Sequence, residues 1–182
     1  MRPPRVTVRA ATPADAKPIQ RVYAPVVQHS AASFEESAPD SEEIARRMLL
    51  RPRLPWLVAE MSGSVAGYAF ASTHRERAAY RWSVDCAVYV DTPFRSQGAG
   101  RLLYERLVTE VVELGYVSLF AGVALPNQAS VSLHEALGFE AVGVFRHVGY
   151  KHGDWRDVGW WQKSLTKTSM PPPEPREWQP TP

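Results

Sequence analysis

The sequence predicts an α/β domain with a mixed sheet and helices on both faces of that sheet. Short runs of strand type alternate with amphipathic helical runs in the order βααβββαβαββ, which is typical of layered α/β folds. The strand-helix-strand unit of residues 84–124 has the length of a right-handed crossover, so its two strands should be parallel. Inside this unit a glycine-containing turn joins the first strand to the helix.

The first 72 residues are expected to form three strands and two helices. After a strand at residues 6–9, Thr12 and Pro13 start a helix as its cap and its first helical residue. The apolar side chains of this helix stand at helical spacing: Ile19, Val22, Tyr23 and Val26. A second helix is expected at 41–50 and is ended by prolines at 52 and 55. Residues 56–61 and 65–72 then form a hairpin around the turn at 62–64.

The second half repeats strands and helices in alternation. A Val-rich strand at 84–90 precedes a long helix at 98–114, which Gly115 ends. A strand at 116–124 and a short helix at 127–137 follow, and Gly138 closes that helix. Strands at 140–150 and 158–164 complete the domain. The folded unit is therefore expected at residues 5–165, and the proline-rich residues 166–182 are expected to form an extended tail.

The composition excludes several classes of protein. The 182 residues are 45% hydrophobic and 22% charged, which argues against a wholly disordered chain. A net charge of +2 makes a nucleic-acid partner unexpected. Cys86, as a single cysteine, excludes an internal disulfide, and the five histidines show no metal-ligand spacing. Without an apolar run of ~20 residues or a secretory signal, we expect a cytoplasmic protein with no membrane partner and no metal.

The turn after residue 90 predicts an anion site. Val88-Tyr89-Val90 ends a strand, and Gly98 and Gly100 open the next helix, whose free N–H groups and dipole point at one spot. Arg95 and Arg101 add positive charge. The dinucleotide fingerprint fails because Leu103 replaces its third glycine, and the Gly-Lys-Ser/Thr of a triphosphate loop is absent. The alternative is a plain tight turn between a strand and a helix.

The stretch 95–100 after this strand resembles the acetyl-CoA pyrophosphate loop of the GNAT superfamily of N-acetyltransferases. Residues 127–139 resemble the second cofactor-contacting helix of that family, and the resemblance covers residues 5–165. The blocks 75–82 and 150–161 are similar to those of phosphinothricin and methionine sulfoximine N-acetyltransferases. The resemblance implies a central splayed sheet, acetyl-CoA as co-substrate, a homodimer, and direct transfer of acetyl to the amino group of such amino acids.

The resemblance also implies a cofactor site. Backbone N–H groups of Val88 and Val90 would face the thioester, and Asn127 would hydrogen-bond the pantetheine arm or the thioester region. The full set of implied cofactor-binding residues is Val88, Tyr89, Val90, Arg95, Ser96, Gln97, Gly98, Ala99, Gly100, Arg101 and Asn127.

Asp85 and His134 are the candidate catalytic residues. Strand alternation puts Asp85 on one face with Ala87 and Tyr89, and a carboxylate in a buried strand is either paired or functional. The resembled subfamily usually has a glutamate here as candidate base, so the shorter Asp85 would act through a water. Its alternative is a structural pair with an arginine, Arg77 or Arg81. His134 would protonate the thiolate or deprotonate the amine, and its alternative is a capping or core histidine.

The expected substrate-binding residues are Phe34, Arg75, Arg77 and Tyr80. Arginines before the strand of Asp85 could clamp an anionic amino acid, although each of the four could be an ordinary surface residue. Cys86 is expected to be a small buried hydrophobe, and the late tryptophans are expected to pack in the core or in a dimer. Two rival functions remain, namely acetylation of another small amine or a protein N-terminus, and non-catalytic acyl-CoA sensing.

Overall fold

The computed structural model describes residues 6–166 and 172–180. The helices and strands follow in the predicted order: β1 (Thr7–Ala10), α1 (Ala16–His29), α2 (Ser41–Met48), β2 (Trp56–Met61), β3 (Ser64–Thr73), β4 (Ser83–Val90), α3 (Ala99–Glu113), β5 (Ser118–Leu125), α4 (Gln128–Ala136), β6 (Glu140–Lys151) and β7 (Asp154–Ser164). Short 3-10 turns precede three of them: η1 (Pro13–Asp15), η2 (Ala78–Tyr80) and η3 (Thr92–Phe94).

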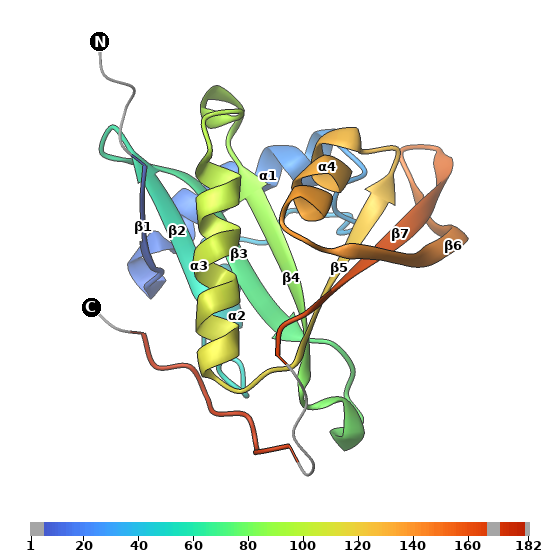
Figure 1. Ribbon diagram of the computed structural model, residues 1–182. Helices are drawn as coiled ribbons and strands as arrows, with labels where there is room; N and C mark the ends of the chain where they lie inside the picture. The colour runs from blue at the N-terminus through green and yellow to red at the C-terminus, as the bar shows by residue number, and fades with distance from the viewer. Residues whose placement is uncertain (1–5, 167–171, 181–182) are drawn as a thin grey trace.

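The strands form one mixed sheet. Its seven strands lie in the order β1-β2-β3-β4-β5-β7-β6 (Figure 1). Only β4 and β5 run parallel, and all the other neighbours are antiparallel. The crossover predicted from residues 84–124 is therefore confirmed, with α3 as its helix.

The two parallel strands pair over three residues and then diverge. Their registered pairs are Ser83 with Ser118, Val84 with Leu119 and Asp85 with Phe120. Beyond that point β4 continues beside β3 as far as Val90, while β5 continues beside β7 as far as Leu125. The expected splay in the middle of the sheet is thus present, and it opens toward the glycine turn.

Helices cover both faces of the sheet and enclose separate cores (Figure 1). Leu103, Leu107 and Val111 of α3 are fully buried on one face. Ile19 and Val22 of α1 pack with α2 on the other. Along β4, Val84 and Cys86 belong to the core of α3, whereas Tyr89 packs toward α1, as strand alternation predicts.

Strand β7 begins four residues before its predicted start at residue 158. Residues 154–157 continue the β6–β7 ladder, and Tyr150 pairs with Trp155. The turn itself is His152-Gly153, whose φ values of 54° and 76° are both left-handed. With this tight two-residue turn, the loop expected at residues 151–157 is replaced by paired strand on both sides of His152-Gly153.

The described tail packs against the domain instead of leaving it. Residues 172–180 contain neither helix nor strand, yet Trp178 is 3% exposed and belongs to the core of α3. Its backbone N–H donates to the Arg53 carbonyl at 2.8 Å, and that of Arg176 donates to the Leu114 carbonyl at 2.8 Å. The packed unit therefore extends beyond residue 165. A lone apolar residue among prolines and charges gives no periodicity from which its burial could be predicted.

Within the ranges 6–166 and 172–180, no helix combines the length and the apolar character needed to cross a membrane.

Candidate active site

The splay between β4 and β5 forms a cleft of about 860 Å³. The cleft is bounded by the last residues of both strands, the first turns of α3 and α4, and the last turns of α1. Ten of the eleven predicted cofactor-binding residues line it: Val88, Tyr89, Val90, Arg95, Ser96, Gly98, Ala99, Gly100, Arg101 and Asn127. Gln97 is not among the lining residues, and its side chain donates to the Pro93 carbonyl at 2.9 Å.

The glycine turn lies at the open end of this cleft. Ser96 and Gly98 have φ values of 59° and 86°, and α3 begins at the next residue, Ala99. The left-handed Gly98 turns the chain so that the free N–H groups of the first helical turn line the cleft. A Cβ at Gly100 would lie 3.5 Å from Leu133 and 3.6 Å from Val90, so a larger side chain would fill the space beside the strand. The turn therefore suits an extended ligand that carries phosphate.

Two arginines flank the turn in different ways. Arg95 donates through Nε to the Val90 carbonyl at 3.1 Å, which holds it at the end of β4. Arg101 pairs with Glu105 one helical turn later, at 2.7 Å. In this part of the described structure Arg95, unlike Arg101, makes no ion pair with a carboxylate, so its charge is available to a ligand.

Asn127 caps α4. Its Oδ1 accepts from the Ser130 N–H at 3.2 Å, so contact with a ligand is left to the amide nitrogen. Asn127 lines the cleft, and the capping hydrogen bond fixes its side chain there. An acyl-CoA ligand would therefore contact Asn127 while this hydrogen bond is kept.

His134 lies deep in the cleft wall and is 3% exposed. Its Nδ1–H donates to the Ser130 carbonyl at 2.7 Å, and its Nε2 lies 2.9 Å from the Tyr104 hydroxyl, which then donates to it. Burial lowers the pKa of His134, against the opposing hydrogen bond to Ser130. Both ring nitrogens are engaged in the neutral form, which supports the core alternative. A catalytic role for His134 stays a prediction.

Asp85 pairs with His74, a partner that the sequence did not indicate. Its Oδ1 accepts from Nδ1 of His74 at 2.6 Å, so the alternative that paired Asp85 with Arg77 or Arg81 is wrong about the partner. Arg81 instead pairs with Glu174 and lies over the ring of Trp82 at 3.7 Å. Burial raises the pKa of Asp85, and the hydrogen bond from His74 and the charge of Arg75 counteract part of that rise.

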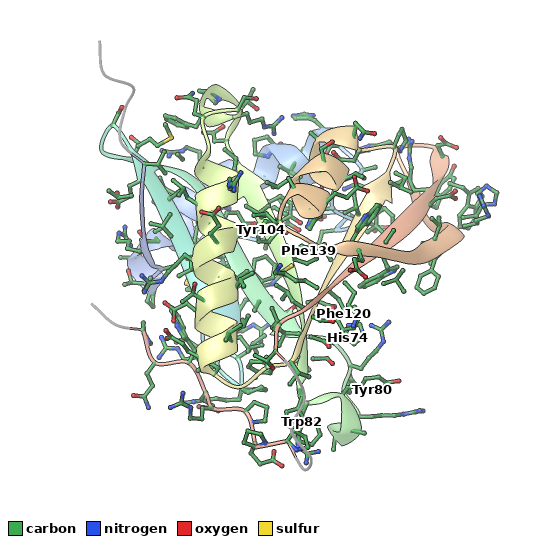
Figure 2. The ribbon with its side chains drawn as sticks, in the orientation of Figure 1. His74, Tyr80, Trp82, Tyr104, Phe120 and Phe139 are labelled. Atoms are coloured by element: carbon green, nitrogen blue, oxygen red, sulfur yellow. The ribbon has the colours of Figure 1, made fainter. Side chains whose placement is uncertain are left out.

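Aromatic rings surround His74 (Figure 2). Its imidazole stacks on Phe120 with centroids 4.3 Å apart, and it meets Trp160 and Tyr80 edge-on at 6.1 and 6.0 Å. Arg75 lies over the Trp160 ring at 5.8 Å. Two predicted substrate residues, Arg75 and Tyr80, therefore gather around the imidazole.

His74, Phe120 and Trp160 are site residues that the sequence alone did not indicate. The register of the β3–β4 hairpin carries the signal for His74. Ser72 pairs with Asp85, and His74, two residues further along, points to the same face and lies diagonally across from that carboxylate. Phe120 reaches the site through the pairing of β5 with β4, and Trp160 through the pairing of β7 with β5, so both depend on strands far apart in the chain.

The other two predicted substrate residues lie elsewhere. Arg77 is exposed and precedes η2. Phe34, in the loop between α1 and α2, packs its ring over Gly149 of β6 and is 41% exposed. None of the four lines the cleft between β4 and β5.

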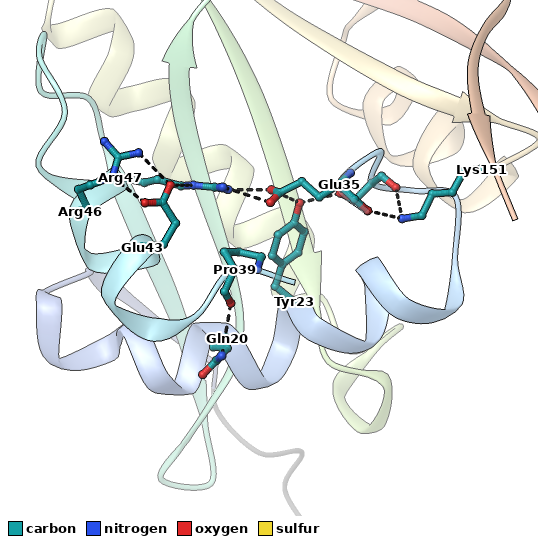
Figure 3. A network of polar contacts seen from close by, with 9 residues as sticks. Gln20, Tyr23, Glu35, Pro39, Glu43, Arg46, Arg47 and Lys151 are labelled. Atoms are coloured by element: carbon teal, nitrogen blue, oxygen red, sulfur yellow. Dashed lines mark hydrogen bonds and ion pairs between the residues drawn. The ribbon is translucent and has the colours of Figure 1, made fainter. Parts of the chain in front are cut away.

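Polar contacts hold the loop of Phe34 in place (Figure 3). Lys151 Nζ donates to the carbonyls of Ser33 and Glu35 at 2.6 and 2.8 Å. The Glu35 carboxylate accepts from Arg47 at 2.7 and 3.1 Å and from the Tyr23 hydroxyl at 2.9 Å. The loop is therefore tied to α1, to α2 and to the end of β6.

Cys86 and Trp161 are buried, as expected for residues that pack in the core. Burial raises the pKa of the Cys86 thiol, which donates to the Phe120 carbonyl at 3.3 Å. Trp161 lies in the core of α3, whereas Trp155 is 56% exposed. Across residues 6–166 and 172–180, no three His, Cys, Asp or Glu side chains come together as a metal site would require.

Comparison with known proteins identifies the family. The family model described as an acetyltransferase (GNAT) domain matches residues 8–160. The chain belongs to the GNAT acetyltransferases. The mixed sheet, the splay and the glycine turn described above agree with the features that the resemblance to this family implied. The chain is therefore an acetyl-transferring enzyme.

Individual GNAT relatives are similar along nearly the whole chain. A phosphinothricin N-acetyltransferase from Streptomyces viridochromogenes is 40% identical over 169 residues, 92% of each protein. An L-methionine sulfoximine/L-methionine sulfone acetyltransferase from Salmonella typhimurium is 33% identical over 91% of this chain and 98% of its own. The structure of a GNAT phosphinothricin acetyltransferase from Sinorhizobium meliloti, in complex with AcCoA, superposes with a TM-score of 0.85. It is 34% identical and covers 97% of this chain and 93% of its own.

Proposed function

We propose that this enzyme transfers acetyl from acetyl-CoA to the amino group of phosphinothricin, methionine sulfoximine or a closely similar amino acid. The observation that carries the proposal is the splayed β4–β5 cleft. The glycine turn lies at its open end, and the Asp85–His74 pair lies next to the point where the two strands separate. The names of the relatives at 33–40% identity support the same substrate class.

The residues of the cleft fit acetyl-CoA, which would supply a reactive thioester. The first-turn N–H groups of α3 and the guanidinium of Arg95 would hold the pyrophosphate. From Val90 back to Cys86, β4 has left β5, so its free edge can bond an extended, amide-containing arm as a further strand would. At about 3.3 Å per residue this edge extends about 13 Å, which leads an arm bound along it to the closed end of the splay.

The acceptor amino acid would bind on the side of His74. Arg75 and Tyr80 lie there as a cation and a hydroxyl, and both suit an α-carboxylate or a second anionic head. Arg77 on the same loop and Phe34 on the loop after α1 are proposed as further contacts.

Thiol release from acetyl-CoA, measured with a panel of acceptors, tests the proposal. The panel contains phosphinothricin, methionine sulfoximine, methionine sulfone, glutamate, a polyamine and an N-terminal peptide. We expect turnover with the first three alone, and a higher KM for the amino acid in Arg75→Gln. The exposed Arg146→Gln is the matched control and should be unchanged. Turnover only with the polyamine or the peptide would remove the substrate assignment.

A second copy of the chain is the proposed partner. Strand β6 is an edge strand with exposed apolar side chains, among them Val142, Phe145 and Val148. Surfaces of this kind are usually covered in an assembly. Sedimentation of the wild type against Val142→Glu would test a homodimer, and a monomeric wild type would contradict it. The cytoplasmic location and the lack of a metal stay predictions.

A further inference from the structure

The hydrogen bond between His74 and Asp85 determines which nitrogen of the imidazole is free. An ionised carboxylate only accepts, so the 2.6 Å bond to Asp85 Oδ1 places the ring proton on Nδ1. In the neutral ring Nε2 then carries the lone pair. None of the hydrogen bonds between described residues uses that atom, so it is free to accept a proton.

The ring is held rigidly. It stacks on Phe120 of β5, meets Trp160 of β7 and Tyr80 of η2 edge-on, and its side chain is 11% exposed. The charged and titratable groups that face it are Asp85 from β4, Arg75 from its own loop and Tyr80, whereas β5 and β7 contribute only the two apolar rings. The bond to Asp85 is therefore the feature that selects the tautomer and the orientation of His74.

The pair stands where the splay closes. Asp85 and Phe120 are the last registered partners of β4 and β5, and the cleft begins beside them at Cys86, Ala87 and Gly122. Leu119, Ala121 and Val123 point into the core of α3, so Phe120 and Gly122 point to the opposite face, where His74 stacks. A ligand that extends from the glycine turn along β4 reaches Cys86 and Ala87, the cleft residues next to this pair.

We propose that His74 is the group that takes a proton from the attacking amine, and that Asp85 is a positioning residue that holds the imidazole. The inference rests on the proposed acetyl transfer and names the base of that reaction. It differs from direct or water-mediated action of Asp85, because the carboxylate oxygen nearest the imidazole is already committed to Nδ1–H.

The proton balance is complete without a further reactant. The acceptor enters as an ammonium ion and gives one proton to Nε2 of His74. The neutral amine attacks the carbonyl carbon, the C–N bond forms and the C–S bond breaks. The second nitrogen proton leaves with the thiolate to give the thiol, and His74 releases its own proton to solvent. One proton is released per turnover.

Variants at His74 and Asp85 separate the two roles. His74→Gln removes the base, and His74→Phe removes it while keeping an aromatic ring stacked on Phe120. We expect either change to lower kcat/KM about 10²- to 10⁴-fold. Either change should also abolish the acidic limb of the profile of kcat/KM against pH, that is, the decrease of kcat/KM as the pH falls. The Kd of acetyl-CoA, measured by calorimetry, should stay within twofold of the wild type. Asp85→Asn can still accept from Nδ1–H, so it should cost only about 10- to 100-fold and keep the limb.

The control is His147→Asn. His147 is exposed outside the cleft at φ 49°, a conformation that asparagine tolerates, and the variant should have wild-type activity. The proposal is overturned if His74→Gln and His74→Phe stay within tenfold of wild-type activity while Asp85→Asn loses the limb. Wild-type turnover with the acceptor panel reports separately on the proposed function. The variant ratios are measured with whichever acceptor the wild type uses.

Discussion

The indole N–H of Trp178 donates to Oε2 of Glu110 at 2.9 Å, joining the described tail to the last turn of α3. Glu110 is 9% exposed, and its other oxygen pairs with Arg106. The indole satisfies one oxygen of a nearly buried carboxylate and at the same time fills space in the core. The tail therefore belongs to the structure of the domain that carries the cleft, because α3 is also the helix that begins at the glycine turn.

Trp178→Ala should destabilise the protein strongly. Removing a buried tryptophan costs about 3–5 kcal/mol, and the Glu110 oxygen would also lose its partner. The free energy of unfolding in urea measures the loss. Trp155→Ala, at a residue 56% exposed, is the matched control and should change it by about 0.5 kcal/mol or less. Equal effects of the two substitutions would show that the tail does not pack in this way in solution.

Glu35→Gln should weaken the loop of Phe34 in a pH-dependent manner. Hydrogen bonds from Arg47 hold the pKa of Glu35 below its usual range, against the burial that would raise it. A carboxylate with a lowered folded-state pKa stabilises the protein above its unfolded pKa, and that stabilisation is lost as pH falls through the folded pKa. The difference between variant and wild type should therefore be about 1 kcal/mol at neutral pH and should disappear in acid.

Urea unfolding at pH 7 and at pH values below about 4 measures this difference. Glu36→Gln is the neighbouring control, since Glu36 is exposed and shows none of the contacts of Figure 3. A difference for Glu35→Gln that persists undiminished in acid would contradict the ion-pair explanation.

The sequence predicted the elements and the cofactor cleft because both depend on local patterns. Caps, apolar spacing and the turn before α3 act within a few residues, and ten of eleven cofactor residues line the cleft as a consequence. The partner of Asp85 could not be found in this way. His74 meets Asp85 through hairpin register and meets Phe120 through a parallel neighbour, so its role depends on pairings between separate segments. Trp178 was missed for the same reason, since its contacts lie in residues more than 60 positions earlier.

Gly149→Ala should impair binding of the acceptor without unfolding the domain. A Cβ at Gly149 would lie 2.7 Å from Cδ2 of Phe34 and closer still to other ring atoms, so the ring must move. Because the ring is the end of a side chain that is 41% exposed, the cost in stability should be below about 1 kcal/mol. We expect a higher KM for the amino acid with little change in kcat. In the same strand, Gly143→Ala meets nothing within 4 Å and should leave KM unchanged. An unchanged KM in both variants would place Phe34 outside the acceptor site.

His134→Gln should reduce stability more than chemistry. The Tyr104 hydroxyl is buried and donates to Nε2 of His134, so removing the imidazole leaves this hydroxyl without its partner at a cost of about 1–3 kcal/mol. Because burial lowers the pKa of His134, the ring is neutral at pH 7 and holds no extra proton for a leaving thiolate. A double-mutant cycle in urea with Tyr104→Phe should give a coupling energy of about 0.5–3 kcal/mol. The kcat of His134→Gln should fall less than tenfold, with its pH profile unchanged. A fall of 10²-fold or more with a normal Kd for acetyl-CoA would instead give His134 a direct part in proton transfer, and Tyr104→Phe would then show whether the hydroxyl carries that proton.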